Sequence, residues 1–173
     1  EQTYPLDQFD SLLSGCHIAV LCNINFSRPF LQNTRQAGVR IASDVHTISD
    51  LEDPYNADFM KSADILFMSD EHLPCSPEEW AKRIINRYGA EIIVIGLGSQ
   101  GVLLCIRSQR LMQRFPAVYT RPIVNSIGAG DALFSSFVHF YGNQGDPLTA
   151  IQYAQVFASY KIGANGAADG FLN

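Results

Sequence analysis

Short apolar runs rich in β-branched residues alternate with helix-like segments along most of this chain. The runs fall at residues 16–24, 39–45, 64–69 and 91–98. Runs of this length are typical of strands buried on both faces of a sheet, and the helical segments between them predict βαβ units. The alternation therefore predicts an α/β fold of three layers, with a mainly parallel sheet and helices on both faces. Ligands of such sheets bind beyond the carboxyl ends of the strands.

The clearest helix start lies at Ser76. This residue is a candidate N-cap, Pro77 follows at the first helical position, and Glu79 completes a capping box. The helix is expected to end at Gly89. Three further elements are a helix over 27–38 with Ser27 as its candidate cap, a hairpin formed by 101–107 and 110–116, and a last helix that starts at Asp146-Pro147.

The length of the chain and its charged residues indicate how many domains it forms and which kinds of binding partner to expect. The 173 residues suit one domain with a hydrophobic core, so 1–173 is expected to be a single domain. No apolar run approaches the length of a membrane span. The 12 Lys and Arg are scattered and outnumbered by 17 Asp and Glu, whereas nucleic-acid binding needs a basic stripe. Neither nucleic acid nor a membrane is expected as a partner.

The four cysteines predict a reducing compartment. Cys16, Cys22, Cys75 and Cys105 lack C-x-x-C spacing and lie in or near apolar stretches. This favours buried structural thiols over zinc ligands or disulfides. Since no signal sequence is indicated at the N-terminus either, a cytoplasmic setting is expected.

The segment 124–141 places two glycines and a carboxylate where a helix must start. Apolar residues recur at helical spacing from about Asp131 onward, so Gly128-Ala129-Gly130 would form the first turn. The first N–H groups of a helix have no internal partners, and with the helix dipole they suit a phosphate. A carboxylate there could act as a base. An ordinary helix start, with Asp131 merely satisfying N–H groups, explains the same pattern.

Four segments resemble the ribokinase-like (PfkB) sugar kinases in family order. SIGAGDALFSSFV at 126–138 resembles the Gly-Ala-Gly-Asp signature of that family. EIIVIGLGSQGVLL at 91–104 is similar to its nucleotide-side strand and turn, and SADILFMSDEHL at 62–73 to the segment that usually carries Asn-x-x-Glu. YAQVFASYKIGANG at 153–166 resembles the final helix beside the adenine pocket.

The resemblance implies a magnesium-dependent kinase that transfers a phosphoryl group from ATP to a hydroxyl of a sugar or nucleoside. It implies Asp131 as the base that activates the hydroxyl. The anion hole would be formed by Gly128, Ala129 and Gly130. The residues implied for nucleotide binding are Gly96, Gly98, Gly101 and Ser126.

The chain departs from the family pattern at several positions. The leading Asp-Thr of the signature falls on Asn125-Ser126, and a further Thr falls on Ile127. The Asn-x-x-Glu positions, which help to organise magnesium and phosphate, fall on Ser69 and His72. Asp70 or Glu71 could hold the metal instead, although a solvated acidic loop explains these two residues as well.

The resemblance also implies a partial fold. The N-terminal strands, the sugar-binding residues and the lid of the family have no counterpart, so 1–173 looks like the C-terminal nucleotide-binding and catalytic portion. The acceptor therefore cannot be read from this chain, and a homodimer is one possible assembly.

Two alternatives remain. A regulatory relative could keep the fold and bind nucleotide without catalysis, as Ser69 and His72 suggest. A dinucleotide-dependent oxidoreductase would use G-x-G-x-x-G at 96–101, but the residues after it read as strands and not as the required helix. A redox cofactor is therefore disfavoured.

Overall fold

A computed structural model describes residues 5–166. In chain order the elements are α1 (Leu6–Leu13), β1 (Ile18–Val20), α2 (Phe30–Gln36), β2 (Arg40–Asp44), α3 (Ala57–Ser62), β3 (Ile65–Ser69), α4 (Pro77–Tyr88), β4 (Ile92–Gly96), the 3₁₀ turn η1 (Gly98–Gln100), β5 (Val102–Ile106), β6 (Leu111–Phe115), α5 (Ala129–Gln144) and α6 (Pro147–Lys161).

The described residues fall into two compact units. Unit 1 contains the described residues up to Ile95 together with Leu103–Gln113. Unit 2 contains Gly96–Val102 and the described residues from Arg114 onward. The single domain expected over 1–173 stays a prediction.

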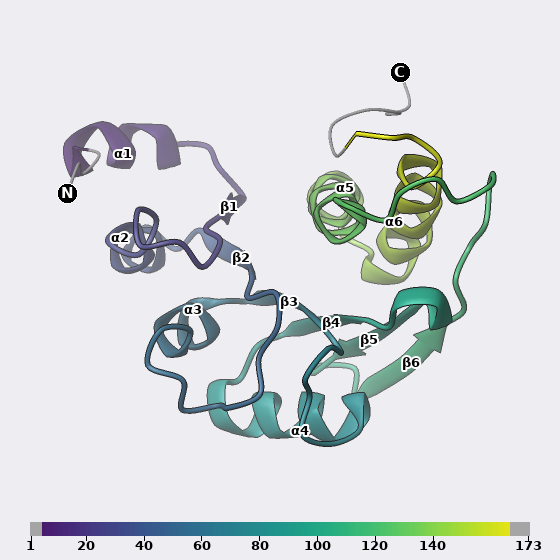
Figure 1. Cartoon of the computed structure of the whole chain (residues 1–173). Helices are drawn as coiled ribbons and strands as arrows, with labels where there is room; N and C mark the ends of the chain where they lie inside the picture. The colour runs from purple at the N-terminus through teal and green to yellow at the C-terminus, as the bar shows by residue number, and fades with distance from the viewer. Residues whose placement is uncertain (1–4, 167–173) are drawn as a thin grey trace. The chain divides into compact units, whose positions relative to one another are not determined.

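A six-stranded sheet runs in the order β1-β2-β3-β4-β5-β6 (Figure 1). The pairs β1–β2 and β2–β3 are parallel, with Ala42 of β2 opposite Ile65 of β3. The connections from β4 to β5 and from β5 to β6 are too short for a crossover, so these neighbouring strands are antiparallel. The α/β prediction is confirmed, and so is the hairpin after the fourth predicted strand.

The helices α3 and α4 lie side by side on one face of the sheet (Figure 1). Phe59 of α3 and Trp80 and Ile84 of α4 are buried, which is why these amphipathic segments form helices here. The α4 boundaries confirm Ser76 as the cap and Gly89 as the end of the helix, but among the described residues the Glu79 carboxylate accepts from Arg83 Nε at 3.2 Å and does not complete the capping box. Ser76 Oγ accepts a hydrogen bond from Glu79 N at 3.3 Å, and Gly89 ends the helix in the left-handed conformation with φ 75°.

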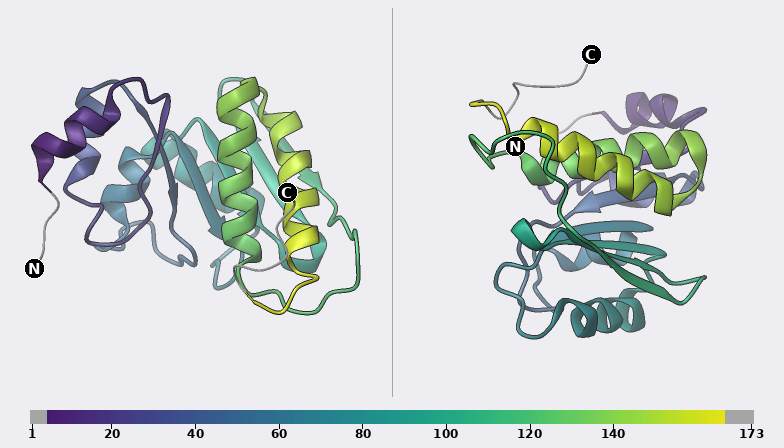
Figure 2. Two further views of the ribbon diagram at one scale, coloured as in Figure 1. Left: turned by 90° about the horizontal axis from the view of Figure 1, so that it is seen from above. Right: turned by 90° about the vertical axis from the view of Figure 1, so that its right-hand side faces the viewer.

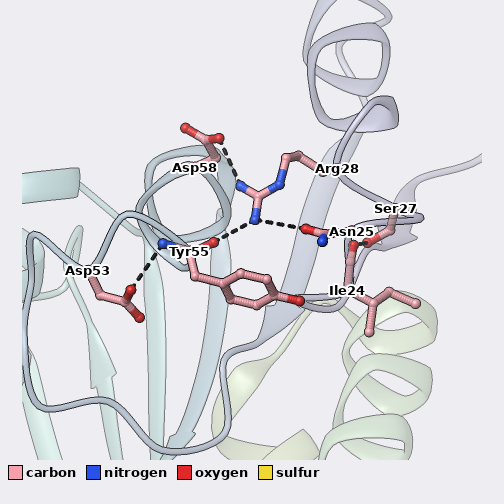
Figure 3. A network of polar contacts seen from close by, with 7 residues as sticks. All are labelled: Ile24, Asn25, Ser27, Arg28, Asp53, Tyr55 and Asp58. Atoms are coloured by element: carbon pink, nitrogen blue, oxygen red, sulfur yellow. Dashed lines mark hydrogen bonds and ion pairs between the residues drawn. The ribbon is translucent and has the colours of Figure 1, made fainter. Parts of the chain in front are cut away.

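The start of α2 differs from the prediction. Ser27 does not cap the helix, because its hydroxyl donates to the carbonyls of Cys22 and Ile24 and so holds the preceding loop. The next residue, Arg28, ties this loop to the start of α3. Its guanidinium donates to Asp58 at 2.9 Å and to the Tyr55 carbonyl at 2.7 Å (Figure 3). The helix therefore begins at Phe30, later than expected.

In unit 2, α5 and α6 pack side by side (Figure 2). The expected cap of α6 is confirmed, because the Asp146 carboxylate accepts from Leu148 N at 3.2 Å and from Thr149 N at 3.0 Å. Within residues 5–166, no helix combines the length and the apolar character that a membrane crossing requires.

Candidate active site

The turn before α5 contains a glycine in a backbone conformation that glycine adopts more easily than other residues do. Gly128 occupies the N-cap position with φ 79° and ψ 7°, in the left-handed region. The helix starts at Ala129, slightly earlier than the apolar pattern indicated, and buries Leu133, Phe134 and Phe137. The turn is therefore the N-terminus of a long, well-packed helix.

Three backbone N–H groups at this turn have no hydrogen-bond acceptor among residues 5–166. The N–H of Ala129 donates to the Ser126 carbonyl at 3.0 Å. In the described part of the chain, the N–H groups of Gly128, Gly130 and Asp131 have no acceptor. Apart from its chain neighbours and the backbone of its own helix, nothing lies within 4 Å of the position that a Cβ on Gly130 would take, so a ligand can approach closely. The turn thus offers three donors at the positive end of a helix dipole.

Asp131 lies in the first turn of α5 and is exposed. Its carboxylate has no hydrogen-bond or ion-pair partner among residues 5–166, and only its backbone carbonyl accepts, from Ser135 Oγ at 2.7 Å. A carboxylate in the first turn is stabilised by the helix dipole. Among the described residues this side chain is therefore not used as a cap.

The segment leading into the turn is held by Asn125. Its Oδ1 accepts from Ile127 N at 3.0 Å, while its Nδ2 donates to the Asn165 carbonyl at 2.7 Å. An aspartate has no N–H to make the second bond. The departure from the Asp of the family signature therefore has a structural use here.

The segment between β6 and α5 follows α6 without forming a helix or strand. The Pro116 carbonyl accepts from Gln155 Nε2 at 2.8 Å, and Thr120 N donates to Ser159 Oγ at 2.7 Å. The next residue of the segment, Arg121, donates from Nε to the Tyr160 carbonyl of α6 at 2.7 Å. The contacts advance along the chain and along the helix together, so α6 fixes the course of the segment.

A second glycine turn joins β4 to β5. Gly96 ends β4, and Gly98 begins η1 with φ 56°. Leu97 N donates to the Gly101 carbonyl at 2.8 Å, and the Tyr119 hydroxyl donates to the Ser99 carbonyl at 3.2 Å. A strand follows this turn, so the helix that a dinucleotide-binding fingerprint requires is absent here.

The candidate metal ligands lie in unit 1, just after β3. Glu71 N donates to Ser69 Oγ at 3.2 Å, and His72 takes a positive φ of 65°. Over the described range, no three His, Cys, Asp or Glu side chains are grouped in a way that could hold a metal ion.

Sequence reasoning missed Lys161, the last residue of α6. Its side chain is buried, and Nζ donates to the Ile127 carbonyl at 3.0 Å. One signal could have found it. The buried residues Ile151 and Ala154 and the later Ala158 recur at helical spacing, and Lys161 falls on the same stripe.

Comparison with known proteins gives independent evidence on the family of this chain. A family model described as "pfkB family carbohydrate kinase" matches residues 59–172. The acarbose 7(IV)-phosphotransferase of Actinoplanes sp. (strain ATCC 31044 / CBS 674.73 / SE50/110) is 29% identical over 124 residues, which are 70% of this chain and 40% of that protein.

Solved structures agree on the fold. The microbiome-derived acarbose kinase Mak1 superposes with a TM-score of 0.88 at 25% identity, over 99% of this chain and 58% of its own. A ribokinase of Arabidopsis thaliana, solved with ribose and ATP, gives a TM-score of 0.77 at 19% identity, over 95% of this chain and 55% of its own.

These relatives are longer than this chain, which spans between 40% and 58% of the three proteins. The family match nevertheless includes the β4–β5 turn, the turn before α5 and the whole of α6. The chain belongs to the pfkB family of carbohydrate kinases.

Proposed function

We propose that this chain supplies the nucleotide-binding and catalytic portion of an ATP-dependent kinase that phosphorylates a hydroxyl of a sugar or nucleoside. The observation that carries the proposal is the turn before α5. Three unpaired N–H groups, of Gly128, Gly130 and Asp131, stand beside an exposed carboxylate that has no other partner in the described chain.

The reaction follows from these groups. The acceptor oxygen attacks the γ-phosphorus, its proton passes to the Asp131 carboxylate, and the bond between the γ-phosphorus and the ADP oxygen breaks. Negative charge spreads over the γ-phosphoryl oxygens in the transition state. Donors that are already fixed stabilise that charge without reorganisation. The free donors support Gly128 and Gly130 as members of the anion hole, whereas the N–H of Ala129 is bonded to Ser126 and would contribute only if that bond opened.

The β4–β5 turn is proposed to bind the nucleotide. The proposed residues are Gly96, Gly98 and Gly101, together with Ser126 just before the turn at α5. Gly98 leaves open space where a side chain would begin, so a ligand can come close to the backbone there, whereas the missing Cβ of Gly101 makes room for the protein's own 115–117 backbone and so shapes the turn. ATP is supported as the donor by a structural neighbour, the Arabidopsis ribokinase, which was solved with ATP.

Magnesium fits this chain if the nucleotide supplies most of its ligands. A magnesium ion commonly takes one or two carboxylates together with substrate phosphates, so the lack of a three-residue cluster in residues 5–166 is compatible with it. Asp70 and Glu71 are the proposed carboxylates. Bound together with ATP, the ion would neutralise charge on the phosphates.

A sugar is the favoured class of acceptor. Two relatives are named for their action on acarbose, a phosphotransferase and a kinase. The ribokinase was solved with ribose. Which hydroxyl is phosphorylated depends on parts of the longer family members that this chain does not span. Cytoplasmic location and homodimer formation remain predictions.

The test compares Asp131→Asn with Asp50→Asn in the complete protein. Both changes remove one exposed carboxylate charge, but Asp50 lies in the loop before α3, where its Oδ1 accepts from Glu52 N. Loss of a general base should lower kcat by about 10²- to 10⁴-fold. Asp131→Asn should show this loss and still bind ATP, while Asp50→Asn should match the wild type. Full turnover by Asp131→Asn would refute the assignment of the base.

A regulatory relative without catalysis is the second candidate. The residues Ser69 and His72 in place of the usual Asn-x-x-Glu positions favour it. Calorimetry that detects ATP binding by the complete wild-type protein, with no phosphorylation across a panel of sugars and nucleosides, would support this candidate over the kinase.

A further inference from the structure

Lys161 is a buried positive side chain at the end of α6. It is 0% exposed, and Nζ donates to the Ile127 carbonyl at 3.0 Å. Among the residues that the structure describes, no carboxylate lies within ion-pair distance of Nζ. A buried charge is costly when it has no counter-charge, and a lysine has three donors to satisfy. This arrangement needs a compensating anion or a structural purpose.

The acceptor of this hydrogen bond belongs to the peptide unit that enters the phosphate-binding turn. The C=O of Ile127 and the N–H of Gly128 share one planar trans peptide, so they point in opposite directions. When Lys161 fixes the carbonyl on its own side, the N–H of Gly128 must point to the other side. The Gly128 N–H is one of the three donors without an acceptor in residues 5–166.

The rest of the loop is attached to α6 by other residues. Val124 N and Asn125 N both donate to the Ile162 carbonyl, at 2.8 and 3.0 Å. These bonds fix the loop two to three residues before Ile127. Lys161 is therefore the contact from α6 that sets the orientation of the last peptide before Gly128.

The position of Lys161 also gives it an electrostatic effect. It is the last residue of α6, where the negative end of the helix dipole stabilises a positive side chain in advance of any ligand. An anion oxygen that accepts from the Gly128 N–H would lie at most about 8 Å from Nζ, given one peptide unit and two hydrogen bonds between them. A partly buried charge at that range is poorly screened by salt.

We propose that Lys161 is a positioning residue for the phosphate-binding turn. It orients the Gly128 N–H toward the phosphoryl group and places a positive charge behind the turn, where the phosphoryl group supplies the missing counter-charge. The inference rests on the proposed function, since it concerns the same turn.

The test uses the complete protein with Lys161→Met, Lys161→Arg and the control Lys82→Met. Lys82 lies on α4 and is exposed, so the control makes the same chemical change away from the turn. For each variant we would measure the thermal midpoint, kcat and KM for ATP, and the calorimetric affinities for ADP and adenosine. Every ADP titration contains magnesium and aluminium fluoride, which takes the place of the γ-phosphoryl group that the turn is proposed to bind. Adenosine lacks phosphates, so it reports on the pocket without the anion.

The expected pattern separates positioning from general damage. Loss of a side chain that orients a ligand-binding group typically costs about 10- to 100-fold, so Lys161→Met should lower kcat and ADP affinity by that order. Affinity for adenosine should be unchanged. Lys161→Arg keeps the charge and the donors and should recover part of both losses, while Lys82→Met should equal the wild type.

Two results would overturn the inference. The first is a Lys161→Met protein with native kcat and native ADP affinity. The second is an equal loss of ADP and adenosine affinity, because that indicates collapse of the whole pocket. If Lys161→Met does not fold, Lys161→Arg is compared with Lys161→Gln, and equal ADP affinity of the two would overturn it.

Failure of the inference and failure of the proposed function are distinguishable. A wild-type protein that binds ADP but transfers no phosphoryl group removes the kinase proposal, and the comparison of ADP with adenosine still tests Lys161. If the wild-type protein is fully active and Lys161→Met behaves like it, the inference about Lys161 is refuted and the proposed function is not. A wild-type protein that does not bind ADP removes both.

Discussion

Replacement of Gly101 by alanine should be far more costly than the same change at Gly98, although both glycines belong to the turn between β4 and β5. A Cβ on Gly101 would lie 2.6 Å from Ala117 N and 2.6 Å from Pro116 C, and closer still to the Phe115 carbonyl oxygen. All three are backbone atoms, so no side chain can rotate away. The φ of 99° is also unfavourable for a residue with a Cβ.

The expected loss of stability in Gly101→Ala is the sum of the steric overlap and the backbone strain. Backbone strain of this kind costs about 1–3 kcal/mol, and forcing atoms into a filled space costs about 1–3 kcal/mol more. Gly101→Ala should therefore lower the free energy of unfolding by about 2–6 kcal/mol. Gly98 also has a positive φ, of 56°, but apart from its chain neighbours nothing lies within 4 Å of the position that a Cβ would take there. Gly98→Ala should cost only about 1–2 kcal/mol.

Urea unfolding of the complete protein, followed by far-UV circular dichroism, would measure both changes. Gly98→Ala is the matched control, because it makes the same substitution in the same turn. If the two variants unfold within about 0.5 kcal/mol of each other, the close approach of the 115–117 backbone to Gly101 does not constrain the protein as the structure indicates.

Three further predictions concern α6, the core and the metal. Asp146→Ala should lower the free energy of unfolding by about 1 kcal/mol at pH 7. Because hydrogen bonds from the Thr149 hydroxyl and N–H lower the pKa of the Asp146 carboxyl, this contribution is present above the unfolded pKa and is lost as the pH falls through the lower folded pKa. The difference in the free energy of unfolding between the wild type and Asp146→Ala, measured with urea, should be smaller at about pH 3 than at pH 7. A difference that stays constant between the two pH values would contradict this prediction. Burial raises the pKa of the Cys105 thiol to about 12, so iodoacetamide near pH 8 should alkylate the exposed Cys16 and spare Cys105 until the protein is denatured. Peptide mass spectrometry would check this, and equal labelling rates would refute it. Chelation of divalent cations with EDTA should abolish phosphoryl transfer, with recovery on added magnesium; transfer that survives chelation would exclude the proposed metal dependence.

Local patterns in the sequence predicted the elements that local chemistry determines. The cap of α4 at Ser76 and the cap of α6 at Asp146 were correct, because a side-chain oxygen and an N–H two or three residues later suffice to form them. The strands were placed within a few residues of their observed bounds, but β1 is not buried as expected, because Ile18 and Ala19 are half-buried and Val20 is exposed. The early helix α1 was not predicted at all.

Contacts between distant segments account for what the sequence could not predict. Ser27 looked like a cap, but its hydroxyl holds the loop before α2. At the turn before α5, the glycines and Asp131 were visible in the sequence, whereas the hydrogen bond of Ala129 to Ser126 depends on the loop conformation. The contact of Lys161 with Ile127 joins residues 34 positions apart, and no periodicity indicates such a pair.

The most direct test of the account is a crystal structure of the complete protein with ADP, magnesium and aluminium fluoride, which mimics the transferred phosphoryl group. The account predicts that the fluoride group lies about 2.7–3.1 Å from the backbone nitrogens of Gly128, Gly130 and Asp131. The Asp131 carboxylate should then stand on the side of the group opposite ADP, where an acceptor hydroxyl would bind. A fluoride group bound elsewhere, with these three N–H groups left in solvent, would contradict the assignment of the turn before α5 as the site of phosphoryl transfer.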